Sequence, residues 1–512
     1  MKRINYLVVL LTSIVLSASC GESLEDTYSD YAGNGKIRYP AKCSGLEVTV
    51  GWKRLELKWN NGIDAVTDKI KVSWSASDVQ HDSLLDRSAT SCDLRDLKDG
   101  TYRLDVRAVD KNGNESLVIT DYARPYTEDH EAVRTFTRAI TKFYKVKNNL
   151  IFFMDQWNDN IVDIKLNYTD TRGKKQPYPL TEEKFNEGFI VLKDVDTRQP
   201  ITIDRLGKLE GCPDIIRFEP VLLGNERTFS SDFKSAIRQR YGYNDQNAAE
   251  ETAFRHFIDT VRTLEFDYDA TTFEDVLYCP RLERLLLGKN RYLYPDPAYS
   301  TPVDNSILYE KGRSLHVLDV ANKLTGLNVE RYHNHYFGPI DRTYIREMGY
   351  PDRRELDRLP YISQMEVDTI KCSVPDSDSD MYLTDLLDND PNTWWESSVS
   401  PTTRAYELTI VLKEVKRVRG IKIAQMLFDP AKDRDSPHYL PPSVIVKTST
   451  NQIDWKNVTY MEENILGKGS GEVTLLPVAE GSREVRYIKV ILHDEVNKGI
   501  FRIKLADIVV YQ

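Results

Sequence analysis

Short segments in which apolar and polar residues alternate recur along most of this chain, and this pattern constrains the fold more than any other feature. LEVTV, RLELKW, KIKVSW and YRLDVRAVD follow one another within residues 46–110. A period of two indicates strands with one buried face, and the nearby Asp-Gly and Asn-Gly pairs favour hairpin turns. The chain is therefore predicted to be mainly β.

Its 512 residues also exceed the size of about 250–300 residues at which a single core stops growing, so we expect several domains. Residues 41–125 resemble a fibronectin type III sandwich in strand spacing. Residues 28–116 also resemble the N-terminal domain of uncharacterised lipoproteins from polysaccharide-utilisation systems, through the Tyr-rich start, the Lys-Trp strand end and the DG-x-Y-x-L…D-x-x-GN-x-S segment. Similar strand patterns, such as VDIKLNYTD and GFIVLKDV, predict a second immunoglobulin-like sandwich over 126–225.

The pattern changes after residue 226. DFKSAIRQRYG and AAEETAFRHFIDTV have the apolar spacing of helices, with acidic residues early in the second. Leu282, Leu285, Leu287 and Asn290 fit L-x-x-L-x-L-x-x-N, which resembles a leucine-rich repeat, so 226–350 is predicted to be a small repeat-like α/β region. The His-x-His between Tyr332 and Tyr336 lacks an identifiable third metal ligand, and we expect a solvated loop there. Prolines among charges predict a linker at 351–364.

The N-terminus predicts export. A basic start, an apolar run over 7–16 and small residues before Cys20 resemble a bacterial lipoprotein signal, in which that thiol is lipidated and becomes the mature N-terminus. An ordinary secretory signal is the alternative. We predict a signal peptide at 1–19 and a tether at 20–40. The acidic residues early in GESLEDTYSDYAGNG, directly after Cys20, resemble surface-export signals of Sus-like glycan-utilisation systems, which implies attachment to the outer membrane, facing the cell exterior. The other cysteines are five, widely spaced and without C-x-x-C, which favours free thiols over a disulfide framework.

The most specific motif lies near the C-terminus, in DNDPNTWW at 388–395. It resembles the D-G-x-x-x-T-x-W turn of coagulation factor 5/8 type C (discoidin) domains, a group that includes family 32 carbohydrate-binding modules. STNQIDW at 449–455, RYIKV at 486–490 and LADIVVY at 505–511 resemble later motifs of the same family in order. Residues 365–512 are therefore predicted to form a discoidin-like β-sandwich, or jelly roll, with Trp395 in its core and Trp394 pointing outward.

This resemblance implies a structural Ca²⁺ beside the turn, bound by hard oxygen ligands. The positions that match the family's calcium ligands imply the following shell: the Asp385 carbonyl, the Asp388 carboxylate, the Asp390 carbonyl, the Thr393 oxygens and the Asp507 carboxylate. Asn389 stands where the family has Gly, and Asn tolerates positive φ. Asp507 is one methylene shorter than the family's Glu, which puts the metal in question. The alternative is a turn that Asp388 stabilises by hydrogen bonds.

The resemblance also implies that ligands bind to loops at one end of the sandwich. The corresponding loops are 396–404 and 428–442, and the predicted ligand-binding residues are Glu396, Asp429, Arg434, His438 and Tyr439. An aromatic ring can stack on the apolar face of a sugar, while Arg or Asp can engage its hydroxyls. An ordinary solvated loop remains the alternative.

Taken together, these features predict a non-catalytic, lipid-anchored surface protein that captures glycans for a Sus-like transporter at the outer membrane. The alternatives are a glycoside hydrolase with a discoidin-like accessory domain, and a protein adhesin. No HExxH, P-loop or nucleophile motif appears, and the 79 acidic residues offer too many carboxylate pairs to select one. The net charge of −10 and the lack of a long basic run argue against nucleic-acid binding.

Overall fold

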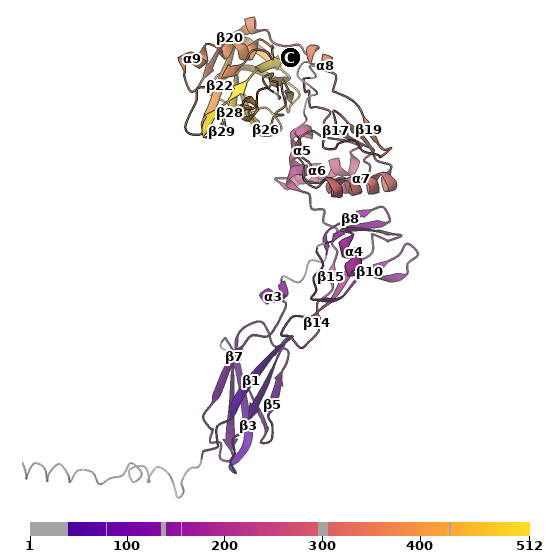
Figure 1. Cartoon of the computed structure of the whole chain (residues 1–512), viewed down its shortest axis with the longest axis vertical. Helices are drawn as coiled ribbons and strands as arrows, with labels where there is room; N and C mark the ends of the chain where they lie inside the picture. Colours follow the sequence, from indigo (N-terminus) through magenta and orange to yellow (C-terminus); the bar gives the residue numbers. More distant parts are fainter. Residues whose placement is uncertain (1–38, 78, 135–139, 155, 295–305, 430–431) are drawn as a thin grey trace, which may run out of the picture. The chain divides into compact units, whose positions relative to one another are not determined.

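The computed structural model describes residues 39–77, 79–134, 140–154, 156–294, 306–429 and 432–512, and Cys20 with its signal sequence lies outside this part. The chain divides into two compact units, of which the second contains residues 144–151 and 224–512. Strands dominate both, which confirms the predicted mainly β, multidomain fold (Figure 1). No helix in the described part is long and apolar enough to cross a membrane.

The first sandwich consists of a three-stranded and a four-stranded sheet. The three-stranded sheet has the order β1 (Ser44–Gly51), β2 (Arg54–Asn60), β5 (Ser91–Leu94). The other has the order β4 (Val79–Asp86), β3 (Thr67–Ala76), β6 (Tyr102–Asp110), β7 (Ile119–Ala123). The alternating apolar residues meet between the sheets, where Leu55, Ile70 and Leu104 are fully buried, as the period-two pattern predicts.

The next region also contains two sheets. One has the order β12 (Phe189–Lys193), β9 (Asn149–Met154), β8 (Ile140–Val146). The other has the order β11 (Lys175–Pro179), β10 (Ile161–Thr169), β13 (Thr202–Gly207), β14 (Ile216–Arg217), and β15 (Val221–Leu222) also pairs with β13. Two short helices, α3 (Glu131–Arg134) and α4 (Glu182–Asn186), accompany these strands.

The second unit continues with an α/β region that contains the predicted helices. These are α5 (Ser231–Tyr241) and α6 (Ala248–Thr260). A parallel sheet follows, in the order β16 (Thr263–Phe266), β17 (Arg284–Leu287), β18 (Asn328–Arg331), β19 (Ile345–Glu347). The 3-10 helix η1 (Glu274–Tyr278) and the helix α7 (Lys311–Thr325) connect successive strands, and the leucine-rich motif forms β17 with Leu285 and Leu287 fully buried.

The expectation of a solvated His-x-His loop is wrong. His333 is only 6% exposed and His335 is fully buried. His333 Nε2 lies 3.0 Å from the Gly288 carbonyl oxygen, and the His335 ring lies so close to Gly288 that a Cβ there would meet it at 2.8 Å. The loop therefore packs against the turn after β17 instead of facing water.

The prediction of a linker at 351–364 is also wrong, because this segment is packed against its neighbours and does not run free between domains. It contains α8 (Arg354–Asp357), and both Leu356 and Ile362 are 5% exposed. The Ile362 N–H donates to the Val510 carbonyl at 2.8 Å. Prolines and charged residues occur throughout this segment, but its apolar side chains are buried in the core. The α/β region and the last domain are therefore packed together.

The last domain is a sandwich, as predicted. Its larger sheet has the order β20 (Val367–Cys372), β22 (Ala405–Val418), β28 (Arg483–His493), β24 (Ser443–Ser449), β25 (Lys456–Asn457), with β26 (Glu463–Ile465) also on β24. The smaller sheet has the order β27 (Val473–Pro477), β23 (Gly420–Ala424), β32 (Asp507–Tyr511). Short pairs complete it: β21 (Trp395–Glu396) with β31 (Lys504–Leu505), and β29 (Glu495–Asn497) with β30 (Ile500–Arg502).

The smaller sheet is covered on both faces. Every residue of β23 and β32 is buried. Ile421 and Ile423 face the sandwich core, whereas Ala424 packs with Tyr292 and Leu356 from the preceding region. A strand whose two faces are both covered loses the simple alternation of a half-buried strand, and even Lys422 is only 6% exposed.

Candidate functional site

The acidic turn directs the two adjacent tryptophans to different surroundings. The Asp388 carboxylate accepts hydrogen bonds from the Asp390 N–H at 2.9 Å and the Thr393 hydroxyl at 2.8 Å. Asn389 adopts φ of 63°, the left-handed conformation expected for this position. The turn leads into β21, where Trp395 is 1% exposed and lies edge-on to Tyr406, while Trp394 remains 37% exposed. The structure therefore places one tryptophan in the core and leaves the other available.

Trp394 lies on a groove of about 600 Å³. A second aromatic side chain, Tyr382, is 48% exposed and lines the same groove. The other lining residues are polar: Asp376, Asp378, Ser379, Asp385, Thr393, Glu396, Ser397 and Ser398. The groove therefore combines exposed rings with carboxylates and hydroxyls, and its size falls within the range of small-molecule sites.

Local contacts fix the polar groups of the groove. Glu396 forms ion pairs with Arg502 and, at 3.2 Å, with Lys504. Hydrogen bonds from the Asp378 N–H and the Ser398 side chain hold the pKa of Asp376 below its usual value. Desolvation, with a smaller contribution from the charge of Asp388, raises the pKa of Asp385. The groove thus presents carboxylates in two different electrostatic environments.

The predicted loop 428–442 contributes less than expected. Glu396 lines the groove, but Asp429, Arg434, His438 and Tyr439 are not among its lining residues. Asp429 forms an ion pair with Lys432 at 2.9 Å, while Arg434 and His438 are exposed.

Tyr439 in particular cannot offer a stacking face. It is 8% exposed at the end of η5 (Ser436–Tyr439), with the Arg502 guanidinium 5.8 Å from its ring centre. The short helix turns this ring inward, so its assignment as a sugar platform is wrong. Sequence reasoning missed Tyr382, Asp376 and Asp378, although an aromatic residue two positions after a polar SDSD run was a usable signal.

A lysine lies beside one of the predicted calcium ligands, Asp507. Asp507 is fully buried, and the Lys422 ammonium lies 3.4 Å from its Oδ2 and also contacts the Asn389 side chain. Desolvation raises the pKa of Asp507 to about 6. Ca²⁺ would need the Asp507 carboxylate as a ligand, but the Lys422 ammonium already lies against it. The residues present therefore do not fit the predicted calcium shell.

We therefore expect the last domain to fold without calcium. Since Lys422 already supplies positive charge beside Asp507, adding millimolar Ca²⁺ or an excess of EDTA should leave the thermal unfolding midpoint of the full chain unchanged. Differential scanning calorimetry measures this directly. A calcium-dependent increase of several degrees, reversed by EDTA, would show that the ion displaces the ammonium and that the predicted shell forms.

The fold defines a mainly β, multidomain protein with one β-sandwich near its N-terminus and another, which carries the groove, in its last domain. A family model described as DUF4998, a domain of unknown function, matches residues 20–204. The comparison with curated proteins gives no match.

Several solved structures are similar to parts of the chain. A family 32 carbohydrate-binding module from Streptococcus pneumoniae EndoD is 11% identical over 28% of this chain and 94% of its own, with a TM-score of 0.23. A two-domain fibronectin type III segment of chicken tenascin is 13% identical over 36% of this chain and 97% of its own length, with a TM-score of 0.18. A two-domain protein of unknown function from Bacteroides fragilis is 15% identical over 34% of this chain and 54% of its own length, with a TM-score of 0.22.

Proposed function

We propose that this chain is a non-catalytic glycan-binding protein, anchored by a lipid on Cys20 to the outer membrane and facing the cell exterior. It would capture polysaccharide or oligosaccharide for a Sus-like transporter. The order of basic, apolar and small residues before Cys20 supports the anchor. The family match also begins at Cys20, the first residue of the proposed mature chain.

The groove beside Trp394 is the observation that carries the binding proposal. A sugar ring has apolar faces edged by hydroxyl groups, so it needs an aromatic platform and nearby hydrogen-bond acceptors. Trp394 and Tyr382 supply exposed rings, and Asp376, Asp378 and Glu396 supply acceptors in the same groove. Because sugar modules bind weakly one at a time, display of many copies on a surface would raise the effective affinity.

One observation favours a second candidate, a glycoside hydrolase. That chemistry uses two carboxyl groups whose pKa values differ, and the same groove contains Asp385 with a raised pKa and Asp376 with a lowered one. We favour binding because both aromatic rings are open to solvent at the groove, whereas glycosidic cleavage benefits from a site that excludes water.

A panel of purified polysaccharides tests the proposal. The full mature chain is expected to retain at least one neutral polysaccharide on affinity gels and to release no reducing ends from it during prolonged incubation. An Asp385→Asn variant is the matched comparison, since it removes the candidate acid and keeps a polar side chain of similar size at this position of the groove. Reducing ends that appear with the parent but not with this variant would establish the hydrolase instead.

A further inference from the structure

A second cavity, of about 340 Å³, lies within the second unit between the α/β region and the last sandwich. One wall comes from α5, β16 and the turn after β17, including Ala236, Glu265 and Asn290. The other comes from the sandwich, around Tyr460, Ile465 and β27. Ligand pockets are common at such junctions between domains, and this volume is within their usual range.

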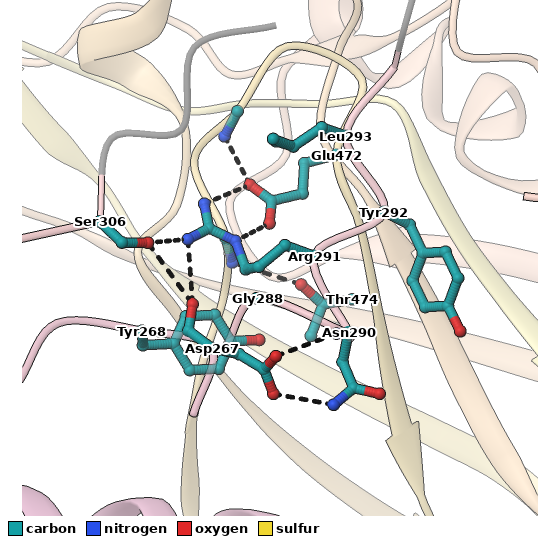
Figure 2. A network of polar contacts seen from close by, with 12 residues as sticks. Asp267, Tyr268, Gly288, Asn290, Arg291, Tyr292, Leu293, Ser306, Glu472 and Thr474 are labelled. Atoms are coloured by element: carbon teal, nitrogen blue, oxygen red, sulfur yellow. Dashed lines mark hydrogen bonds and ion pairs between the residues drawn. The ribbon is translucent and has the colours of Figure 1, made fainter. Parts of the chain in front are cut away.

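A buried ion pair joins the α/β region to the last sandwich. Arg291 and Glu472 have side chains 2% and 1% exposed, and the Arg291 Nη2 donates to the Glu472 carboxylate at 2.8 Å (Figure 2). Arg291 also donates to the Asp267 carbonyl at 3.0 Å, and its guanidinium lies 5.6 Å from the centre of the Tyr268 ring. Gly467 and Gly469 make room for Glu472, since a Cβ on Gly467 would meet it at 2.0 Å. Asp267 and Tyr268 line the cavity, so this network positions part of the cavity wall.

The sandwich wall is largely apolar. It includes Ile465, Leu476 and Pro477, together with the ring of Tyr460. The Tyr460 ring packs on Gly242, the left-handed residue that ends α5, where a Cβ would meet the ring at 2.4 Å. This contact positions the Tyr460 ring, which lines the cavity.

The opposite wall offers oriented polar groups. The Asn290 amide nitrogen donates to Glu265 at 3.0 Å and to Asp267 at 2.9 Å, which leaves the carboxylates side by side (Figure 2 shows Asn290 and Asp267). Arg240 donates to Glu265 at 2.5 Å. Although burial acts in the other direction, Arg240, Asn290 and Lys289 keep the pKa of Glu265 below its usual value, so this carboxylate stays charged and accepts hydrogen bonds.

The balance of charge selects among ligands. The lining contains four carboxylates, Asp232, Glu265, Asp267 and Asp269, against one cation, Arg240. Lys289, 3.5 Å from Glu265, offsets only part of this excess. An anionic ligand, such as a uronic acid or a sulfated sugar, would be repelled, whereas hydroxyl or ammonium groups would find acceptors.

We propose that this cavity is a second carbohydrate site, which binds one residue of a neutral or amino sugar with its apolar face on Tyr460 and its hydroxyl or amino groups on the Glu265–Asp267 wall. The ligand class rests on the proposed glycan-binding function, but the site shares no lining residue with the groove beside Trp394. A chain with both sites could hold one glycan at two points, which would raise its affinity without any new contact.

The test uses the full mature chain with three probes of one ring type: glucose, glucosamine and glucuronate, followed by ligand-observed NMR and calorimetry. Ala236→Phe fills the cavity, and Ser235→Phe is a second filling variant in case the first one unfolds. We expect glucose or glucosamine to bind, glucuronate to bind at least tenfold more weakly, and either folded filling variant to lose binding at least tenfold. Each filling variant is also made in a Trp394→Ala background, in which the groove has lost its ring, so that the remaining binding reports the cavity.

The proposal is overturned if none of the probes binds, if glucuronate binds as tightly as the others, if both folded filling variants bind like Trp394→Ala in that background, or if Trp394→Ala abolishes binding. These results separate the two sites. Loss of polysaccharide capture with intact binding in the cavity would remove the proposed role of the groove and leave the second site standing.

Discussion

Trp395→Ala is expected to unfold the last sandwich, because truncating a fully buried tryptophan costs about 3–5 kcal/mol. Trp395 is 1% exposed and belongs to the same core cluster as Leu386, Tyr406 and Leu505. Its removal would leave a large cavity at the strand that follows the acidic turn. Denaturant unfolding of the full chain, followed by tryptophan fluorescence and circular dichroism, measures the loss.

Trp394→Ala is the matched control, since it removes the same side chain one residue earlier. Trp394 is 37% exposed, so its loss should cost much less stability than the loss of Trp395. If both variants lose stability equally, or if Trp395→Ala unfolds like the parent, the core position assigned to Trp395 is incorrect.

Glu472→Gln is expected to have an effect of similar size at the junction of the second unit. This change preserves shape but leaves the Arg291 guanidinium buried without its counter-charge. Breaking a buried pair by removing one partner typically costs about 3–5 kcal/mol. The network in Figure 2 would loosen, and hydrogen exchange should increase around residues 288–293 and 467–474.

The control for this variant is Glu251→Gln, which breaks the ion pair between Glu251 and Arg255, one turn apart on α6. Their side chains are 49% and 39% exposed, so this pair should be worth only about 0.3–0.5 kcal/mol. A Glu472→Gln protein as stable as the Glu251→Gln protein would mean that Arg291 and Glu472 do not lock the two regions together.

Local patterns predicted the elements of this chain well. Alternation identified the strands of the first and last sandwiches, and the motif at 388–395 located both the left-handed Asn389 and the buried Trp395. These features depend on residues close in sequence, where turn geometry and the side-chain period are decisive. The leucine-rich motif likewise predicted β17, with its buried Leu285 and Leu287.

Contacts between distant segments account for the rest. Tyr439 and His335 have sequence surroundings typical of exposed loops, yet the Arg502 guanidinium lies over Tyr439 and the turn at Gly288 packs against His335. The sequence pattern predicts that Lys422 points into solvent. It is buried because Tyr292, Leu356 and their neighbours cover its face of the sheet. The second cavity could not be predicted at all, because its walls are more than 160 residues apart in the chain.

Calorimetry of the full mature chain with a neutral oligosaccharide taken from the polysaccharide panel tests the central claim most directly. Trp394→Ala and Tyr382→Ala each remove an exposed ring from the groove. By analogy with base–aromatic stacking, each loss costs about 1–3 kcal/mol, or roughly ten- to a hundredfold in Kd. His438→Ala removes an exposed side chain outside the groove and should bind like the parent. If both ring variants stay folded and bind as tightly as His438→Ala, the groove is not the glycan-binding site.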